Sequence, residues 1–341
     1  MLAAAAASCA NGSSPAHHAQ VLPPAGDDLY SVVALDPRVH VLTQGDVFHL
    51  QGRGNVEVIE QSNGVVLIDS GGSPAGADEV IAYISARTRK PVTAIVLTHW
   101  HGDHSLGISR LLEQWPHARV IATAKTRDML ANPIADNFMP GDDAEANQRY
   151  TTNNTEAVEY LRHEGENQSR AAAIREGFAR SAAEYARFAQ EMTAAHRAAP
   201  TETFADHLDL PDHVAPVRIL YLGRANTEGD AIAWLPSQRI VMTGDTLVGP
   251  IPYGFNAYPR DWIDVLARIK ALGFVALVPG HGLPVRDAAY LDTISAMLTA
   301  IRAQVAPLAA DASITNDNVG ARVDLSGFQT QFAQDDAWLR T

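Results

Sequence analysis

Thr98-His99-Trp100-His101-Gly102-Asp103-His104 is the stretch that decides the fold and the candidate site of this chain. It follows Val92–Leu97, an apolar run that is typical of a buried strand. Neutral imidazole nitrogen and carboxylate oxygen are the ligands that zinc and similar divalent ions bind. We therefore predict a metal site at the end of a buried strand. A solvated, histidine-rich turn is the alternative.

Three later stretches repeat this arrangement, because each places polar side chains soon after an apolar run. They contain Asn226, Asp245 and His281. Taken singly, Asp245 in its Thr-Gly-Asp-Thr context would be read as a turn or capping residue, and His281 as a surface residue. Their order after the first cluster favours a shared metal site.

The first stretch resembles the His-x-His-x-Asp-His signature of the metallo-β-lactamase superfamily, and the three later stretches resemble the ligand loops that follow it there. The resemblance extends over about residues 39–305. It implies an α/β fold, a four-layer αββα sandwich in which the ligand loops meet at one edge of the two sheets.

The resemblance also implies two groups of metal ligands. One consists of Asp103, His104 and His281, the other of His99, His101 and Asn226, with Asp245 as a bridge between them. The cofactor would be one or two Zn²⁺ ions, with manganese or iron as other candidates. Asp103 would be the catalytic residue, because it would hold metal and orient the nucleophile.

Asn226 is a departure from the family pattern, which has a third histidine at this place. An amide oxygen is a harder and poorer ligand for zinc than imidazole nitrogen. Three outcomes follow: an enzyme with one metal, ligation through the amide oxygen of Asn226, or a non-catalytic relative that binds a metal or another ligand.

The implied reaction is hydrolysis by a metal-bound hydroxide. The substrate would be an ester, lactone, thioester or amide, with β-lactams included. We expect Trp100, Tyr253 and Phe255 to contact this small molecule, and core packing is the alternative role for them. Asp69 and Asp230 are candidates to orient ligands and their loops, and a plain turn or capping role is the alternative for both.

Composition restricts the partners. The 341 residues carry a formal net charge of −13, and such an acidic surface repels phosphate backbones, so we expect no nucleic acid partner. No apolar run is long enough to cross a membrane.

The N-terminal 30 residues are expected to form a signal remnant and tether. Leu2–Ala7 resembles the end of a signal peptide's apolar region, and Ala7-Ser8-Cys9 resembles a lipoprotein cleavage box with Cys9 as the lipid acceptor. We expect a periplasmic or secreted protein. A cytoplasmic protein with a flexible start is the alternative.

Residues 31–341 are expected to form one metallo-β-lactamase-like domain with a helical insert at about 125–205. Hairpins are predicted at 39–50 and 55–69, and helical periodicity begins at Glu156. Phe178, Tyr185, Phe188 and Met192 fall on one face of the predicted helix. The insert could be a lid over the site, a homodimer surface, or a helix pair packed on the scaffold.

Overall fold

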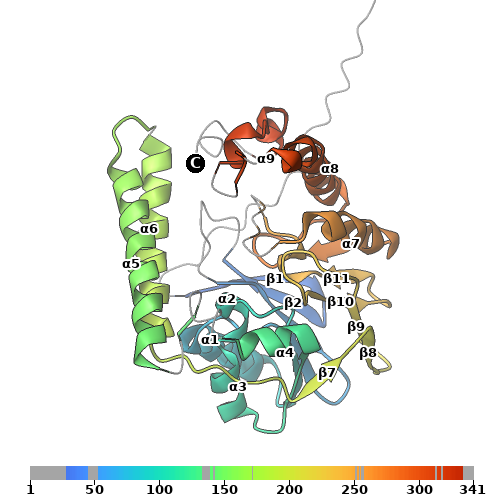
Figure 1. Ribbon diagram of the computed structural model, residues 1–341. Helices are drawn as coiled ribbons and strands as arrows, with labels where there is room; N and C mark the ends of the chain where they lie inside the picture. The colour runs from blue at the N-terminus through green and yellow to red at the C-terminus, as the bar shows by residue number, and fades with distance from the viewer. Residues whose placement is uncertain are drawn as a thin grey trace, which may run out of the picture.

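Two mixed β-sheets form the centre of the protein (Figure 1). The structure is a computed structural model that describes residues 28–44, 53–132, 139–140, 143–170, 172–249, 252, 254, 257–311, 313–315 and 318–332. The first sheet has the order β1-β2-β3-β4-β5-β6-β7, and the second has the order β12-β11-β10-β9-β8. The strands are β1 (Ser31–Asp36), β2 (Val39–Thr43), β3 (Val56–Glu60), β4 (Val65–Ile68), β5 (Val92–Val96), β6 (Arg119–Thr123), β7 (Glu202–Phe204), β8 (His207–Leu210), β9 (Val217–Tyr221), β10 (Ala231–Leu235), β11 (Ile240–Met242) and β12 (Ala276–Val278).

Helices cover the outer face of each sheet. They are α1 (Pro74–Arg87), α2 (Gly102–Ser105), α3 (Ile108–Gln114), α4 (Ala124–Leu130), α5 (Ala144–Glu166), α6 (Ala172–Met192), α7 (Pro259–Ala271), α8 (Ala289–Val305) and α9 (Gln329–Phe332). Short 3₁₀ turns are η2 (Gly244–Thr246), η3 (Ala306–Ala310), η4 (Gly320–Arg322) and η5 (Ser326–Phe328). Among the described helices, none combines the length and the apolarity that crossing a bilayer requires.

Three apolar clusters account for the layers. The inner cluster joins the facing sides of the two sheets, for example Ile68 of β4 and Ile219 of β9. A second cluster packs α1 and α3 on the first sheet, and a third packs α7 and α8 on the second sheet. Strands buried on both faces read as continuous apolar runs, because neither face meets water. The predicted four-layer αββα sandwich is confirmed.

The mixed strand directions follow from the connections. β3 and β4 are antiparallel, because the turn around Gly64 joins them directly and its carbonyl accepts from Gln61 N at 2.9 Å. β4, β5 and β6 are parallel to one another, because helices connect them in sequence. The predicted hairpin at 55–69 is therefore confirmed.

The other predicted hairpin is wrong. β2 pairs with β1 on one edge and with β3 on the other, so no edge of Val39–Thr43 is open to residues 46–50. Those residues, like Cys9 and the first 27 positions, lie outside the described part of the chain. The structure also adds β7 and β8, which we do not predict, at the end of the stretch assigned to the insert.

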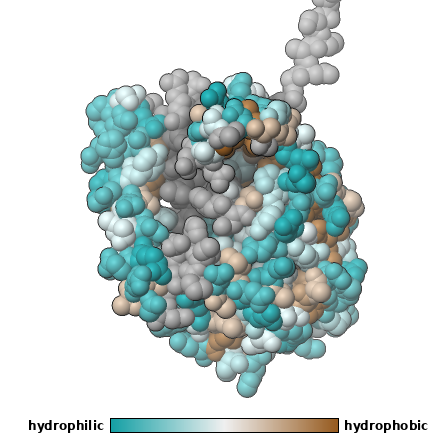
Figure 2. Space-filling model, viewed as in Figure 1, coloured by the Kyte–Doolittle hydropathy of each residue, from teal (hydrophilic) through white to brown (hydrophobic). Residues whose placement is uncertain are grey.

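The helix pair α5 and α6 stands to one side of the sandwich (Figure 1). α5 begins at Ala144, earlier than the predicted Glu156, because the side chain of Asp143 accepts from Ala146 N at 2.8 Å and caps the helix. The residues around Met129 form α4, and Thr123 caps that helix. Phe178, Phe188 and Met192 are buried as predicted, and the outer surface of the pair is mostly hydrophilic (Figure 2).

Candidate metal centre

The predicted ligand residues meet at one edge of the sandwich. Asp103 and His104 lie in α2, soon after β5, and Asp245 lies in η2, directly after β11. His281 follows β12, and Asn226 lies in the loop between β9 and β10. Strands that run in the same direction bring their carboxyl ends to one edge, so residues far apart in sequence converge there.

His104 lies at the centre of this group. Its Nδ1 is 2.7 Å from Oδ2 of Asp69, a residue at the end of β4 with a positive φ of 60°. The other oxygen of Asp69 accepts from Thr98 N at 2.8 Å, so the carboxylate is held in place. The Nδ1 proton is donated to Asp69, so Nε2 is the ring atom that faces the site and would bind a metal.

Three atoms of other candidate ligands converge on His104 Nε2. His104 Nε2 lies 3.1 Å from His281 Nε2, 3.2 Å from Asp245 Oδ1 and 3.5 Å from Asp103 Oδ2. His281 Nε2 is 2.9 Å from Asp103 Oδ2. One atom from each of Asp103, His104 and His281 lies within 4.8 Å of the others. This is the first of the two expected ligand groups.

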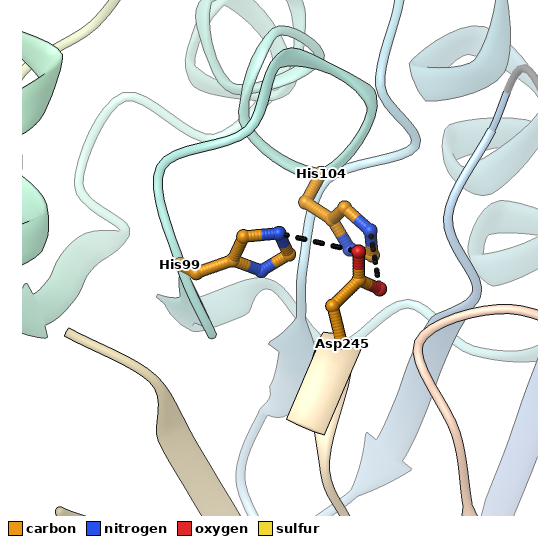
Figure 3. A group of neighbouring side chains, drawn as sticks. All are labelled: His99, His104 and Asp245. Atoms are coloured by element: carbon orange, nitrogen blue, oxygen red, sulfur yellow. Dashed lines mark ion pairs between the residues drawn. The ribbon is translucent and has the colours of Figure 1, made fainter. Parts of the chain in front are cut away.

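The second group is less complete. His99 Nε2 lies 3.6 Å from Asp245 Oδ2, and His101 Nδ1 lies 4.0 Å from the same oxygen. His99, His104 and Asp245 also fall within 4.8 Å of one another. Figure 3 shows their side chains pointing toward one another, with Asp245 between the two imidazoles.

Asn226 is brought to the same place. Its Nδ2 donates to Asp245 Oδ2 at 3.4 Å, while its buried Oδ1 makes no hydrogen bond to a described residue. Asp230 holds the loop by accepting from Ala225 N at 3.1 Å and Thr227 N at 2.8 Å. Burial raises the pKa of Asp230 to about 7, against the lowering effect of these hydrogen bonds. These hydrogen bonds fit both the orienting role and the plain turn role expected of Asp230.

The electrostatics of this group of side chains favour the binding of a cation. Burial lowers the pKa of His104, but three surrounding carboxylates outweigh it and hold that pKa well above its ordinary value. Burial lowers the pKa of His99 well below its ordinary range, and neighbouring His104 lowers it further. His99 is therefore a neutral imidazole, and its buried Nε2 makes no hydrogen bond to a described residue.

These observations test whether a metal fits. Burial disfavours the carboxylate of Asp245, yet the imidazoles around it hold its pKa well below the ordinary value, so it is charged. Lone pairs of buried nitrogen and oxygen atoms that face one another are costly unless a cation lies between them. The donors of Asp103, His104, Asp245 and His281 fit a divalent ion in chemistry and convergence.

Gly54 and Gly280, which we do not predict as site residues, leave the space that these side chains occupy. A Cβ at Gly54 would lie 2.3 Å from the His104 ring, and a Cβ at Gly280 would lie 2.0 Å from Asp245 Oδ1. Any larger residue would displace a ligand. The only sequence signal is glycine beside a strand or a histidine, which is too common to identify either position.

Of the three residues expected to contact substrate, Trp100 alone belongs to the described part of the chain. Trp100 has no exposed surface and packs in a cluster with Leu97, Leu106 and residues of α6, so its core-packing role is the one observed. Tyr253 and Phe255 lie outside the described residues. Asp103 has the most exposed side chain of the candidate ligands, at 22%, and its Oδ2 lies 2.9 Å from His281 Nε2.

Comparison with known proteins agrees with the geometry. Residues 50–281 match the family model described as "Metallo-beta-lactamase superfamily". A linear primary-alkylsulfatase from Pseudomonas sp. (strain ATCC 19151) is 23% identical over 246 residues, which cover 67% of this chain and 41% of that protein. An atrochrysone carboxyl ACP thioesterase from Aspergillus chevalieri is 37% identical over 101 residues, 29% of this chain and 31% of that protein. The chain thus spans less than half the length of these curated relatives.

A solved structure shows the same fold. The metallo-beta-lactamase from Pontibacter korlensis superposes with a TM-score of 0.54 at 18% sequence identity. The superposition covers 79% of this chain and 99% of that one. The sandwich is therefore shared almost in full with that protein, while about a fifth of this chain lies beyond it.

Proposed function

The chain belongs to the metallo-beta-lactamase superfamily of hydrolases, and on that premise we propose that it is a metal-dependent hydrolase that uses zinc. The substrate class we propose is a small ester, lactone, thioester or amide. One observation carries the proposal: the carboxylates of Asp103 and Asp245 each lie within 3.5 Å of both His104 Nε2 and His281 Nε2, and the two nitrogens lie 3.1 Å apart.

Asp103, His104 and His281 would hold the metal, with Asp245 beside them. A zinc ion held by these residues would supply a bound water with a pKa of about 7 and a positive charge that polarises the bond to be cleaved. The role of Asp69 is to fix the His104 ring through Nδ1, so that Nε2 always faces the metal.

Asp103 has a second task in this proposal. Burial raises its pKa, but His104 and His281 outweigh burial and hold that pKa below its ordinary value. Its side chain is also 22% exposed, so a charged oxygen reaches the open side of the centre. Such a carboxylate accepts a hydrogen bond from the attacking water and orients it toward the substrate.

The relatives' names guide the choice of substrates. An alkylsulfatase and a thioesterase are among them, which adds alkyl sulfates and thioesters to the activated esters, lactones and β-lactams worth testing. The low share of those proteins that the chain covers leaves their own substrates as candidates only.

The test is a hydrolase panel run on the zinc-loaded protein with Asp103→Asn beside it. We expect at least one class to be hydrolysed, with a chelator abolishing the activity and added zinc restoring it. Asp103→Asn removes a charged ligand and the orienting carboxylate, so kcat/KM should fall by about 10²–10⁴-fold. Asp292→Asn, at an exposed ion pair with Lys270, is the matched control and should retain full activity.

Circular dichroism of both variants shows whether the fold is kept. Zinc binding without turnover of any class would favour a binding protein over an enzyme. Activity that survives Asp103→Asn would contradict the proposed role of this carboxylate.

A further inference from the structure

Arg53 is a buried cation whose partners come from the helical insert. Its side chain has no exposed surface. Two guanidinium nitrogens donate to the two oxygens of Glu191 in α6, at 2.7 and 3.0 Å. The Arg53 Nε lies 3.4 Å from Glu184 Oε1, and its Cζ lies 5.1 Å from the ring centre of Phe188. A bidentate pair of this kind fixes orientation as well as charge.

Ser73, the N-cap residue of α1, hydrogen-bonds to both residues of the Arg53–Glu191 pair. Its hydroxyl accepts from Arg53 at 2.8 Å and donates to Glu191 at 2.9 Å. The hydroxyl also caps α1 by accepting from Gly76 N at 3.0 Å. The Arg53–Glu191 pair is thus attached to an element that belongs to the sandwich itself.

The two residues that follow Arg53 touch the candidate metal centre directly. Gly54 N donates to the Asp103 carbonyl at 3.2 Å, and the missing side chain of Gly54 is the space that the His104 ring fills. Asn55 N donates to the Gly280 carbonyl at 2.7 Å, and the Asn55 amide donates to two further carbonyls of loop 279–282 at 2.8 and 2.9 Å. The Arg53–Asn55 segment therefore lies between the two ligand loops.

The charge of Arg53 makes the position of the Arg53–Asn55 segment depend on α6. A buried guanidinium is costly without carboxylate partners. Among the described residues, the carboxylates within 4.0 Å of Arg53 are Glu184 and Glu191, and both belong to α6. If α6 moves away, Arg53 must follow it or reach water, and either movement displaces Gly54 from the His104 ring.

We propose that Arg53 is a positioning residue that couples the docking of α6 to the geometry of Asp103, His104 and His281, so that the insert strengthens metal binding. This inference rests on the proposed metal site. The insert is then part of the machinery that holds the ligands, although it supplies none of the proposed ligands itself.

The test compares two charge-removing variants of similar ion pairs. Glu191→Gln breaks the pair with Arg53. Glu164→Gln breaks the pair with Arg170, whose Cζ also lies 5.1 Å from a phenylalanine ring of α6, that of Phe178, but which has no described contact with the ligand loops. The readout is the zinc dissociation constant of each full-length protein, measured by competition with a chromophoric chelator.

We expect Glu191→Gln to raise the zinc dissociation constant by about 10-fold or more, the size of effect seen for residues that orient ligands. Glu164→Gln should leave it unchanged. Arg53→Lys keeps the charge but loses the planar fork, so it should raise the constant less, in the same direction. If Glu191→Gln does not fold, Arg53→Lys carries the test against the same control.

Equal zinc affinity of Glu191→Gln and the wild type would overturn the inference, as would an equal loss in Glu164→Gln. Failure of the proposed metal site gives a different result, since the wild-type chain itself would then bind no zinc, and absence of turnover leaves the comparison of zinc affinities intact. A measurement of zinc affinity before any turnover assay therefore separates the two.

Discussion

At the scale of single residues, we expect Asn226 to set how many metals the centre holds. Its amide stands where the family pattern has an imidazole, and it donates to Asp245 Oδ2, the oxygen that lies 3.6 Å from His99 Nε2 and 4.0 Å from His101 Nδ1. An amide offers one neutral oxygen, which zinc binds less well than nitrogen. We therefore expect one tight site at Asp103, His104 and His281, and a weaker one at His99 and His101.

Asn226→His should repair the weaker site. The change replaces a poor zinc ligand with a good one at a position that already faces Asp245. We expect the variant to retain a second zinc equivalent after dialysis, measured by elemental analysis, whereas the wild type retains one. Asn167→His, on the exposed end of α5, is the control and should add none. Unchanged zinc content would mean that residue 226 does not face a second metal.

At the scale of elements, Asp212 shows how loops join the two sheets. It follows β8 and accepts from Ser62 N in the β3–β4 turn at 2.9 Å, and from Val214 N and Ala215 N at 2.9 and 3.0 Å. Beside it, the amide of Gln61 donates to the Ala215 carbonyl at 2.9 Å. These hydrogen bonds connect the β3–β4 turn of the first sheet to the loop that follows β8 in the second sheet.

Asp212 should make stability depend on acid pH. Partial burial raises its pKa, but three backbone donors favour the carboxylate and hold that pKa below the ordinary 3.8. The stabilisation is present above pH 3.8 and is lost as the pH falls below it. Asp212→Asn should lower the free energy of unfolding by about 1–2 kcal/mol at pH 7.

Urea unfolding between pH 7 and pH 3 measures this effect. The difference between Asp212→Asn and the wild type should shrink as the pH falls below 3.8. Asp209→Asn, which removes one exposed ion pair with Arg218, is the control and should change stability little at any pH. A difference that stays constant down to pH 3 would contradict the role given to the carboxylate.

At the scale of the whole molecule, the helix pair α5 and α6 is packed on the sandwich through an apolar cluster. The cluster joins Tyr150, Phe188 and Met192 of the pair to Leu97 and Trp100 of the ligand segment. Each large apolar side chain buried there contributes about 1.5–3 kcal/mol. The pair is thus a part of the core rather than a separate unit hinged to it.

Deletion of residues 143–193 should therefore unfold the protein. It exposes the cluster around Trp100 and leaves Arg53 without its carboxylates, a loss of about 3–5 kcal/mol for the broken pair alone. We expect an insoluble chain, or one without a cooperative thermal transition by circular dichroism. The added substitution Arg53→Met should recover some soluble protein. A deletion variant that unfolds cooperatively at the wild-type temperature would show that the pair is dispensable.

The sequence by itself determined β2, the β3–β4 hairpin, β5 and the cluster of candidate ligands. The apolar run Val92–Leu97 and the histidines behind it are neighbours in the chain, so a local pattern reports both the strand and the chemistry at its end. The order of Asn226, Asp245 and His281 after other apolar runs placed them at one sheet edge, because parallel strands end together.

Only the tertiary structure decided how these ligands are held. Arg53 and Glu191 are 138 residues apart, Asp69 and His104 are 35 apart, and Gly54 and His104 meet only because the sheet brings them together. The position of β1 was also decided by the tertiary structure. β1 pairs with the edge of β2 where the alternating pattern of Asp46–Leu50 predicts a different strand. Periodicity reports which face of an element is buried. It carries no information about which distant charge or ring will fill the space opposite, since that depends on how the whole chain packs.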